Sequence, residues 1–239
     1  MSGFILKLIA AATMLIDHAG LLLFPGQPWM RVVGRIAYPL FAWCIAEGFR
    51  YTRNRMRYFL QIFILGVGCQ IVYTIAEGDL YFGILLTFSF SIVIMALFRE
   101  TRAALQREYT VFGDFLQNHG ASAAVRTGIV TAALFGAALL CAVITASVRV
   151  DYGFIGIFVP VLAYLPDNKW LQRVFFVGGL LALSLVNWQL GDHVQIWCLL
   201  ALIPLVLYNG RPGKYRMKWF FYIFYPAHMA LLYLLSVIF

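Results

Sequence analysis

The sequence is a succession of apolar runs, several of them long enough to cross a lipid bilayer. Of the 239 residues, 63% are hydrophobic and 12% are charged, whereas charged residues make up roughly a quarter of an ordinary soluble domain. A membrane-spanning helix needs about 20 apolar residues. Runs bounded by charges, glycine or proline predict nine spans, three of them short, at residues 4–24, 36–49, 58–76, 80–98, 127–148, 152–165, 170–187, 193–208 and 219–238. The sequence therefore predicts an all-α polytopic membrane helix bundle, with residues 1–239 forming a single transmembrane domain.

The distribution of basic residues predicts which way the chain crosses the membrane. With a cytoplasmic N-terminus, 15 of the 18 lysines and arginines fall on the inner side of the nine spans. Arg31, Arg35 and Arg149 fall on the outer side, together with the acidic residues Glu77 and Asp79. Because basic residues concentrate in cytoplasmic loops, we expect a cytoplasmic N-terminus. The net charge of +8 then reflects membrane topology, and we expect no nucleic-acid partner.

Two further features limit the chemistry that the chain can carry. Its four cysteines lie inside apolar runs and show no C-x-x-C spacing, so we expect neither a metal site nor a disulfide. No basic cluster precedes the first apolar run, which is also longer than the core of a signal peptide. We therefore expect the first helix to be retained in the protein.

The first apolar run contains three ionisable residues, Lys7, Asp17 and His18. A charge at the bilayer centre costs at least ~2.5–3.5 kcal/mol, so such residues indicate function. Lys7 and His18 share one helix face about 16 Å apart, with Lys7 near the inner surface and His18 toward the outside. Asp17 points about 100° away from His18 and cannot orient it within the same helix. The simpler alternatives are that Lys7 extends to the membrane surface and that His18 makes an ordinary interhelical hydrogen bond.

Two charged residues are predicted to lie on the same outer side as His18. Arg35, at the start of the second span, is expected either to pair with Asp17 or to hold an anionic group near His18. Asp151, in the segment VDYGFIG, is expected to orient His18 or an acceptor amine, and the alternative is that it caps the following helix. Both readings remain open for each residue.

A second histidine lies inside the last predicted span. Pro226 interrupts the apolar run KWFFYIFYPAHMALLYLL and frees a backbone carbonyl. His228 follows two residues later, at a depth of about 15 Å from Lys218, which places it near the middle of the membrane.

A run of arginines follows the second span. Guanidinium groups bind phosphate through paired hydrogen bonds, so these side chains are candidates to receive the phosphates of a nucleotide-like donor from the cytosol. A plain topology signal is the alternative reading. The residues are Arg50, Arg53, Arg55 and Arg57.

Together, these segments resemble the TraX family of membrane proteins, named for a conjugative pilin acetylase. The resemblance covers nearly the whole chain and is carried in order by LIAAATMLIDH after Lys7, GRIAYPLFAWCIAEGFRYTRN, VDYGFIG and KWFFYIFYPAH. More distantly, the spacing from Lys7 to His18 is similar to the Arg-x10-His spacing of the acyltransferase-three superfamily, with lysine in place of arginine.

The resemblance implies a multi-pass protein of the bacterial cytoplasmic (inner) membrane that takes an acetyl or other acyl group from acyl-CoA on the cytoplasmic side. The acceptor would be an amine or hydroxyl on an unknown small molecule, glycan or peptide. His18 would be the general base or acyl relay, and the implied catalytic set is Asp17, His18, Asp151 and His228. Donor binding, with acetyl-CoA as co-substrate, would involve Lys7, Arg35, Arg50, Arg53, Asn54 and Lys218.

Two other function classes fit the same residues. Intramembrane histidine, aspartate and arginine can form the path of a proton-coupled transporter or flippase. The chain can also be a non-enzymatic assembly partner of a secretion or conjugation system. Flux without acyl-CoA favours the first of these, whereas the second leaves the buried ionisable residues without a role.

Overall fold

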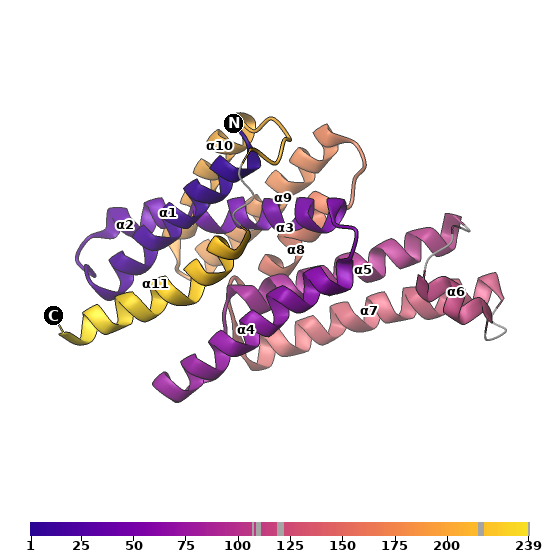
Figure 1. The fold of residues 1–239 in the computed structure, drawn as a ribbon, viewed down its shortest axis with the longest axis horizontal. Helices are drawn as coiled ribbons and strands as arrows, with labels where there is room; N and C mark the ends of the chain where they lie inside the picture. Colours follow the sequence, from indigo (N-terminus) through magenta and orange to yellow (C-terminus); the bar gives the residue numbers. More distant parts are fainter. Residues whose placement is uncertain (107, 109–110, 119–121, 215–217, 239) are drawn as a thin grey trace. The chain divides into compact units, whose positions relative to one another are not determined.

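The computed structural model describes residues 1–106, 108, 111–118, 122–214 and 218–238 and is almost entirely helical (Figure 1). Its elements, in chain order, are α1 (Gly3–Leu22), α2 (Pro28–Gly34), α3 (Ala37–Tyr51), α4 (Arg55–Glu77), β1 (Tyr81–Phe82), α5 (Ile84–Gln106), α6 (Val111–Asn118), α7 (Ala123–Ser147), β2 (Arg149–Val150), α8 (Gly153–Tyr164), α9 (Lys169–Gln189), the 3₁₀ helix η1 (His193–Ala201), α10 (Leu202–Val206) and α11 (Lys218–Ile238). The prediction of an all-α polytopic helix bundle is confirmed.

Within the described residues, seven helical segments are long and apolar enough to cross a membrane. Two further apolar helices, Gly153–Tyr164 and His193–Val206, are shorter. These nine segments correspond one to one with the nine predicted runs. The prediction that the two short segments also span the bilayer has not been tested. The cytoplasmic position of the N-terminus likewise remains a prediction.

The boundaries differ most from the prediction at two places. The second run is longer than 36–49 because α2 and α3, which follow one another across a break at Arg35 and Ile36, together cover Pro28–Tyr51. The fourth run was expected to end at residue 98, but α5 continues to Gln106. Arginine and glutamate are good helix formers, so the helix continues after the apolar sequence has ended.

The chain divides into two compact units, one formed by residues 1–48 and 166–239 and the other by residues 49–165. That the whole chain forms a single transmembrane domain remains a prediction. The boundary passes through the last turn of α3.

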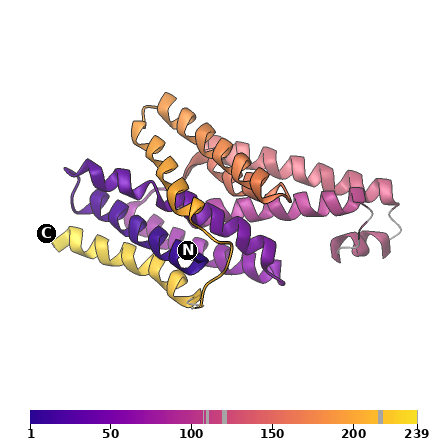
Figure 2. The same cartoon turned by 90° about the horizontal axis from the view of Figure 1, so that it is seen from above.

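In the first unit, α1 packs against α2 and α11, and η1 packs against α9 and α2. Helices α1 and α11 run side by side in both views (Figures 1 and 2). At one end of this unit, Gly3 N donates to Arg211 O at 2.8 Å and Phe4 N donates to Pro212 O at 3.0 Å. At the same end, the Tyr208 hydroxyl donates to Glu47 Oε2 at 2.6 Å.

In the second unit, α5 packs against α4, α7 and α8. The strands β1 and β2 form a short parallel pair in which Tyr81 is opposite Arg149. This pair joins the two loops that were both predicted to lie outside. Helix α4 begins with Asn54 as its N-cap and ends at Gly78, whose positive φ of 70° provides the left-handed C-cap conformation that glycine adopts readily.

Candidate functional site

Two intramembrane histidines contact each other in the first unit. Nδ1 of His18, on α1, lies 2.9 Å from Nε2 of His228, on α11. The two residues are 210 positions apart in sequence, and their ring centroids lie 5.0 Å apart. His228 is 4% exposed, whereas His18 is partly exposed. The structure thus brings together the two histidines that the sequence analysis assigned to one site.

The hydrogen bonds of His228 determine where the protons of the neutral pair lie. Nδ1 of His228 is 2.8 Å from the carbonyl oxygen of Phe224, and a carbonyl only accepts, so this nitrogen carries the hydrogen. Nε2 of the same ring is then an acceptor, which receives the Nδ1 hydrogen of His18. The lone pair of His18 is therefore on Nε2, which makes no hydrogen bond to any described residue. This nitrogen is the one that can take a proton from a substrate.

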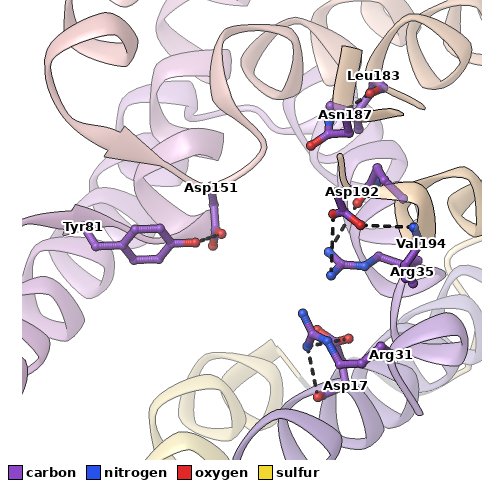
Figure 3. Close-up of polar contacts among 10 residues, drawn as sticks. Asp17, Arg31, Arg35, Tyr81, Asp151, Leu183, Asn187, Asp192 and Val194 are labelled. Atoms are coloured by element: carbon purple, nitrogen blue, oxygen red, sulfur yellow. Dashed lines mark hydrogen bonds and ion pairs between the residues drawn. The ribbon is translucent and has the colours of Figure 1, made fainter. Parts of the chain in front are cut away.

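Asp17 lies next to His18 in sequence but is held by a different helix. Its Oδ1 forms an ion pair with Arg31 Nη1 at 2.8 Å, and Arg31 also donates to the Asp17 carbonyl oxygen at 3.2 Å (Figure 3). A Cβ at position 34 would overlap the Asp17 carboxylate, so Gly34 is needed for this close approach of α2 to α1. The sequence analysis considered Arg35 as the partner of Asp17 and gave Arg31 no role. These two arginines are four positions apart, about one helical turn, so sequence alone did not distinguish them.

Arg35 lies in a polar network with the segment around η1. Its Nη1 donates to Gln195 Oε1 at 3.2 Å. Figure 3 shows its second contact, in which Nη2 lies 4.0 Å from Asp192 Oδ2. Asp192 also caps η1 by accepting from Val194 N at 3.1 Å, and Gln195 is only 1% exposed. Sequence reasoning missed both Asp192 and Gln195.

Two guanidinium groups lie within electrostatic range of His18. The charges of Arg31 and Arg35 both act on the His18 ring. The first unit therefore combines a histidine with an available lone pair, a second histidine that orients it, and two cationic groups nearby. This combination suits proton transfer from a nucleophile together with stabilisation of negative charge.

Asp151 belongs to the second unit. Its carboxylate accepts a hydrogen bond from the Tyr81 hydroxyl (Figure 3), and its carbonyl oxygen accepts one from Thr87 Oγ1 at 3.0 Å. The N-cap of α8 is Tyr152 rather than Asp151, so the capping alternative is wrong. A role for Asp151 beside His18 remains a prediction.

A second pairing holds the same two loops of the second unit. Arg149 and Asp79 form an ion pair between largely exposed side chains. Hydrogen bonding to Asp79 raises the pKa of the Arg149 guanidinium. The loop that contains Asp79 and the loop that contains Arg149 are therefore joined in three ways. These are the β1–β2 pair, the Tyr81–Asp151 hydrogen bond and the Arg149–Asp79 ion pair.

The residues predicted to bind the acyl donor are in different environments. Lys7 and Arg53 are exposed, and the Lys7 charge acts on Glu47. Asn54 is the N-cap of α4, where its side chain accepts from Arg57 N at 2.8 Å.

Arg50 and Lys218 complete the predicted donor set. Arg50 Nη2 donates to the Tyr164 carbonyl oxygen at 2.6 Å. Lys218 begins α11, and its side chain lies outside the described residues. In the described part of the chain, no group of three or more histidine, cysteine, aspartate or glutamate residues is arranged to hold a metal ion.

Comparison with known proteins agrees with the family resemblance that the sequence motifs indicate. The family model described as TraX protein matches residues 2–236. The chain belongs to the TraX family. The match includes both His18 and His228, so the whole candidate site of the first unit lies within this TraX homology.

Two curated proteins are similar to this TraX-family chain. The probable fimbrial assembly protein FimC, serogroup H1, of Dichelobacter nodosus is 28% identical, and the alignment covers 97% of this chain and 94% of that protein. The uncharacterized protein RP591 of Rickettsia prowazekii (strain Madrid E) is 43% identical over 72 residues, which are 30% of this chain and 27% of that protein. No solved structure matches the chain. The distant resemblance to the acyltransferase-three superfamily remains a prediction.

Proposed function

We propose that this TraX-family protein is a membrane-embedded acyltransferase in which His18 is the general base. The acyl group, most simply acetyl, comes from acyl-CoA on the cytoplasmic side and passes to a hydroxyl or amine acceptor. The observation that carries the proposal is the histidine pair, because a 2.9 Å contact to His228 holds His18 with its Nε2 lone pair available. A neutral histidine with a free ring nitrogen can act as a general base.

In the proposed reaction, the thioester of acyl-CoA supplies an activated acyl group and a thiol leaving group. Nε2 of His18 accepts the proton of the acceptor O–H or N–H as the oxygen or nitrogen bonds to the acyl carbon. His228 stabilises the resulting imidazolium, because its Nε2 accepts the Nδ1 hydrogen of His18. Arg35 or Arg31 stabilises negative charge on the acyl oxygen. As the carbon–sulfur bond breaks, His18 returns its proton to the sulfur and becomes neutral again.

The biological setting that we propose is the assembly of surface filaments at the bacterial inner membrane. The FimC relative is named a probable fimbrial assembly protein and aligns over nearly the whole chain. An acetyl group on a filament subunit, or on a glycan attached to it, would connect acyl transfer with assembly. The same name also favours a second candidate function, that of an assembly partner that performs no chemistry.

The experiment compares acyl transfer by the wild type and by His18→Ala. Membranes that contain each protein are incubated with radiolabelled acetyl-CoA and extracts of the source cells, and the label in protein and glycan fractions is measured. We expect transfer by the wild type and its loss in His18→Ala, with both proteins folded in detergent. His193→Ala is the matched control, because His193 is exposed and packs against Trp188. Full transfer by His18→Ala would exclude His18 as the base, whereas normal filament assembly by that variant would favour the second candidate.

A further inference from the structure

Two arginines of the second unit cover a pair of aromatic rings. Phe49 and Tyr164 pack edge to face, with ring centroids 5.1 Å apart and an interplanar angle of 79°. The Arg50 guanidinium lies 5.0 Å from the centre of the Tyr164 ring, and the Arg55 guanidinium lies 5.5 Å from the centre of the Phe49 ring. Stacking of this kind holds guanidinium planes in place.

Two more arginines, on α5, lie within electrostatic range of Tyr164. The charges of Arg99 and Arg102 act on Tyr164 together with those of Arg50 and Arg55. Both residues lie in the part of α5 that extends past the predicted end of the apolar run. The end of α3, the start of α4 and the end of α5 thus contribute to one group, the arginine cluster, which consists of Arg50, Arg55, Arg99 and Arg102.

Basic residues that only orient the chain in the membrane need not be clustered in this way. Exposed arginines dispersed over a loop satisfy the positive-inside rule equally well, and Arg53 and Arg57 are exposed in this way. The four residues of the arginine cluster are instead partly buried. Like charges that are close together and partly buried repel one another, which raises the free energy of the folded protein. A bound anion would reduce this repulsion, whereas dispersed arginines have no such repulsion to reduce.

Arg55 has a hydrogen-bond donor that no described residue accepts. Its Nε is buried and has no hydrogen-bond partner, and it forms no ion pair with any described residue. Arg99 pairs with the neighbouring Glu100 at 3.2 Å. A guanidinium that is stacked on a ring but not paired with a carboxylate still has its planar set of donors, which matches the oxygens of a phosphate.

We propose that the arginine cluster binds the phosphate groups of a phosphorylated ligand at the predicted inner membrane surface. Its assignment to the nucleotide end of the acyl donor rests on the proposed function. Four guanidinium groups suit a ligand with several phosphates, such as coenzyme A, and a phospholipid headgroup offers the same chemistry with one phosphate. The inference replaces Arg53 and Asn54 of the predicted donor set with Arg55, Arg99 and Arg102.

The test measures coenzyme A binding by full-length protein in phosphatidylcholine nanodiscs with isothermal titration calorimetry. We expect saturable binding that inorganic pyrophosphate displaces. Loss of one charge-assisted contact in Arg55→Gln or Arg99→Gln should raise the Kd roughly tenfold or more. Arg173→Gln is the matched control, since Arg173 is an exposed arginine of α9 that is also predicted to lie inside, and its Kd should equal that of the wild type. Equal Kd values for all four proteins, or equal weakening by Arg173→Gln, would overturn the proposal.

A second arm distinguishes the two sources of phosphate. Nanodiscs that contain phosphatidylglycerol are compared with the phosphatidylcholine discs, and lipid that remains bound is measured by native mass spectrometry. Retention of phosphatidylglycerol by the wild type but not by Arg55→Gln, without coenzyme A binding, would support the phosphate site and overturn its assignment to the acyl donor. His18→Ala separates this inference from the proposed function, because it should abolish acyl transfer while leaving the Kd for coenzyme A unchanged.

Discussion

Nδ1 of His18 and Nε2 of His228 lie 2.9 Å apart and join the first and last long helices of the chain. Each ring alone would be an uncompensated polar group in an apolar helix. Paired, and with Nδ1 of His228 directed at the Phe224 carbonyl, the two rings use three of their four nitrogens. The remaining nitrogen is on His18, which is why the proposed chemistry is assigned to that residue and orientation to His228.

The first prediction concerns His228 as a positioning residue. His228→Ala should lower kcat for acyl transfer about 10²-fold and leave KM nearly unchanged, because His18 loses the acceptor for its Nδ1 hydrogen but the substrates keep their contacts. His228→Gln should recover part of the lost kcat, since a glutamine oxygen can accept the same hydrogen bond. Steady-state kinetics on the three proteins check this. Equal losses in the alanine and glutamine variants, or a change confined to KM, would contradict the positioning role.

The second prediction concerns the close approach at Gly34. Gly34→Ala places a methyl group where the Asp17 carboxylate lies, so it should lower the free energy of unfolding by about 1–3 kcal/mol. Gly178→Ala in α9 is the matched control, because a Cβ there meets no atom within 4 Å. Thermal unfolding in detergent compares the two variants with the wild type. An unchanged melting temperature for Gly34→Ala would mean that α1 and α2 are not packed as described.

The third prediction concerns the ion pair between Asp17 and Arg31. Their side chains are 14% and 27% exposed, respectively, so removing one partner leaves a largely buried charge uncompensated. Asp17→Asn and Arg31→Gln should each lower the free energy of unfolding by about 2 kcal/mol, less than for a fully buried pair. The double variant should lose much less than the sum of the two. Additive losses in a double-mutant cycle would show that the pair is not coupled.

The apolar runs could be predicted from the sequence because the length and hydrophobicity of a single run are enough to indicate a membrane-spanning helix. Pairings between distant helices could not, since they depend on packing across the bundle. The sequence offered Arg35 as the partner of Asp17, and the actual pairing with Arg31 follows from the turn between α1 and α2 and from the small side chain of Gly34. His228 was grouped with His18 through the family resemblance, and their contact depends on the packing of α1 against α11.

Helix ends were harder to predict than helix positions. Hydropathy marks where the lipid ends, whereas a helix ends where its backbone hydrogen bonds end. Arg99 and Arg102 were therefore placed beyond the fourth predicted run, which ended at residue 98, although both lie in α5. This difference concealed the arginine cluster, and it also hid the role of Asn54 as a helix cap.

The last prediction concerns the orientation of the first unit. Residues predicted to lie inside meet at one end of it, where Gly3 bonds to Arg211 and the charges of Lys7 and Lys169 act on Glu47. Gln27, in the turn after α1, is exposed and is predicted to lie outside. In a parent with the four cysteines replaced, Ser2→Cys and Asn209→Cys should therefore label with an impermeant maleimide only after the cells are opened. Gln27→Cys should label in intact cells.

The unmodified parent provides the background for this labelling, and a cytoplasmic marker protein verifies that the cells remain closed. Labelling of Ser2→Cys and Asn209→Cys on opposite sides would contradict the hydrogen bonds between residues 3–4 and 211–212. Labelling of both from outside, with Gln27→Cys protected, would show that the chain has the opposite orientation in the membrane. His18 would then lie toward the cytoplasm, and the acyl donor would reach it without crossing the membrane. The result therefore decides whether the proposed transfer must pass the acyl group through the bilayer or can take place on one side of it.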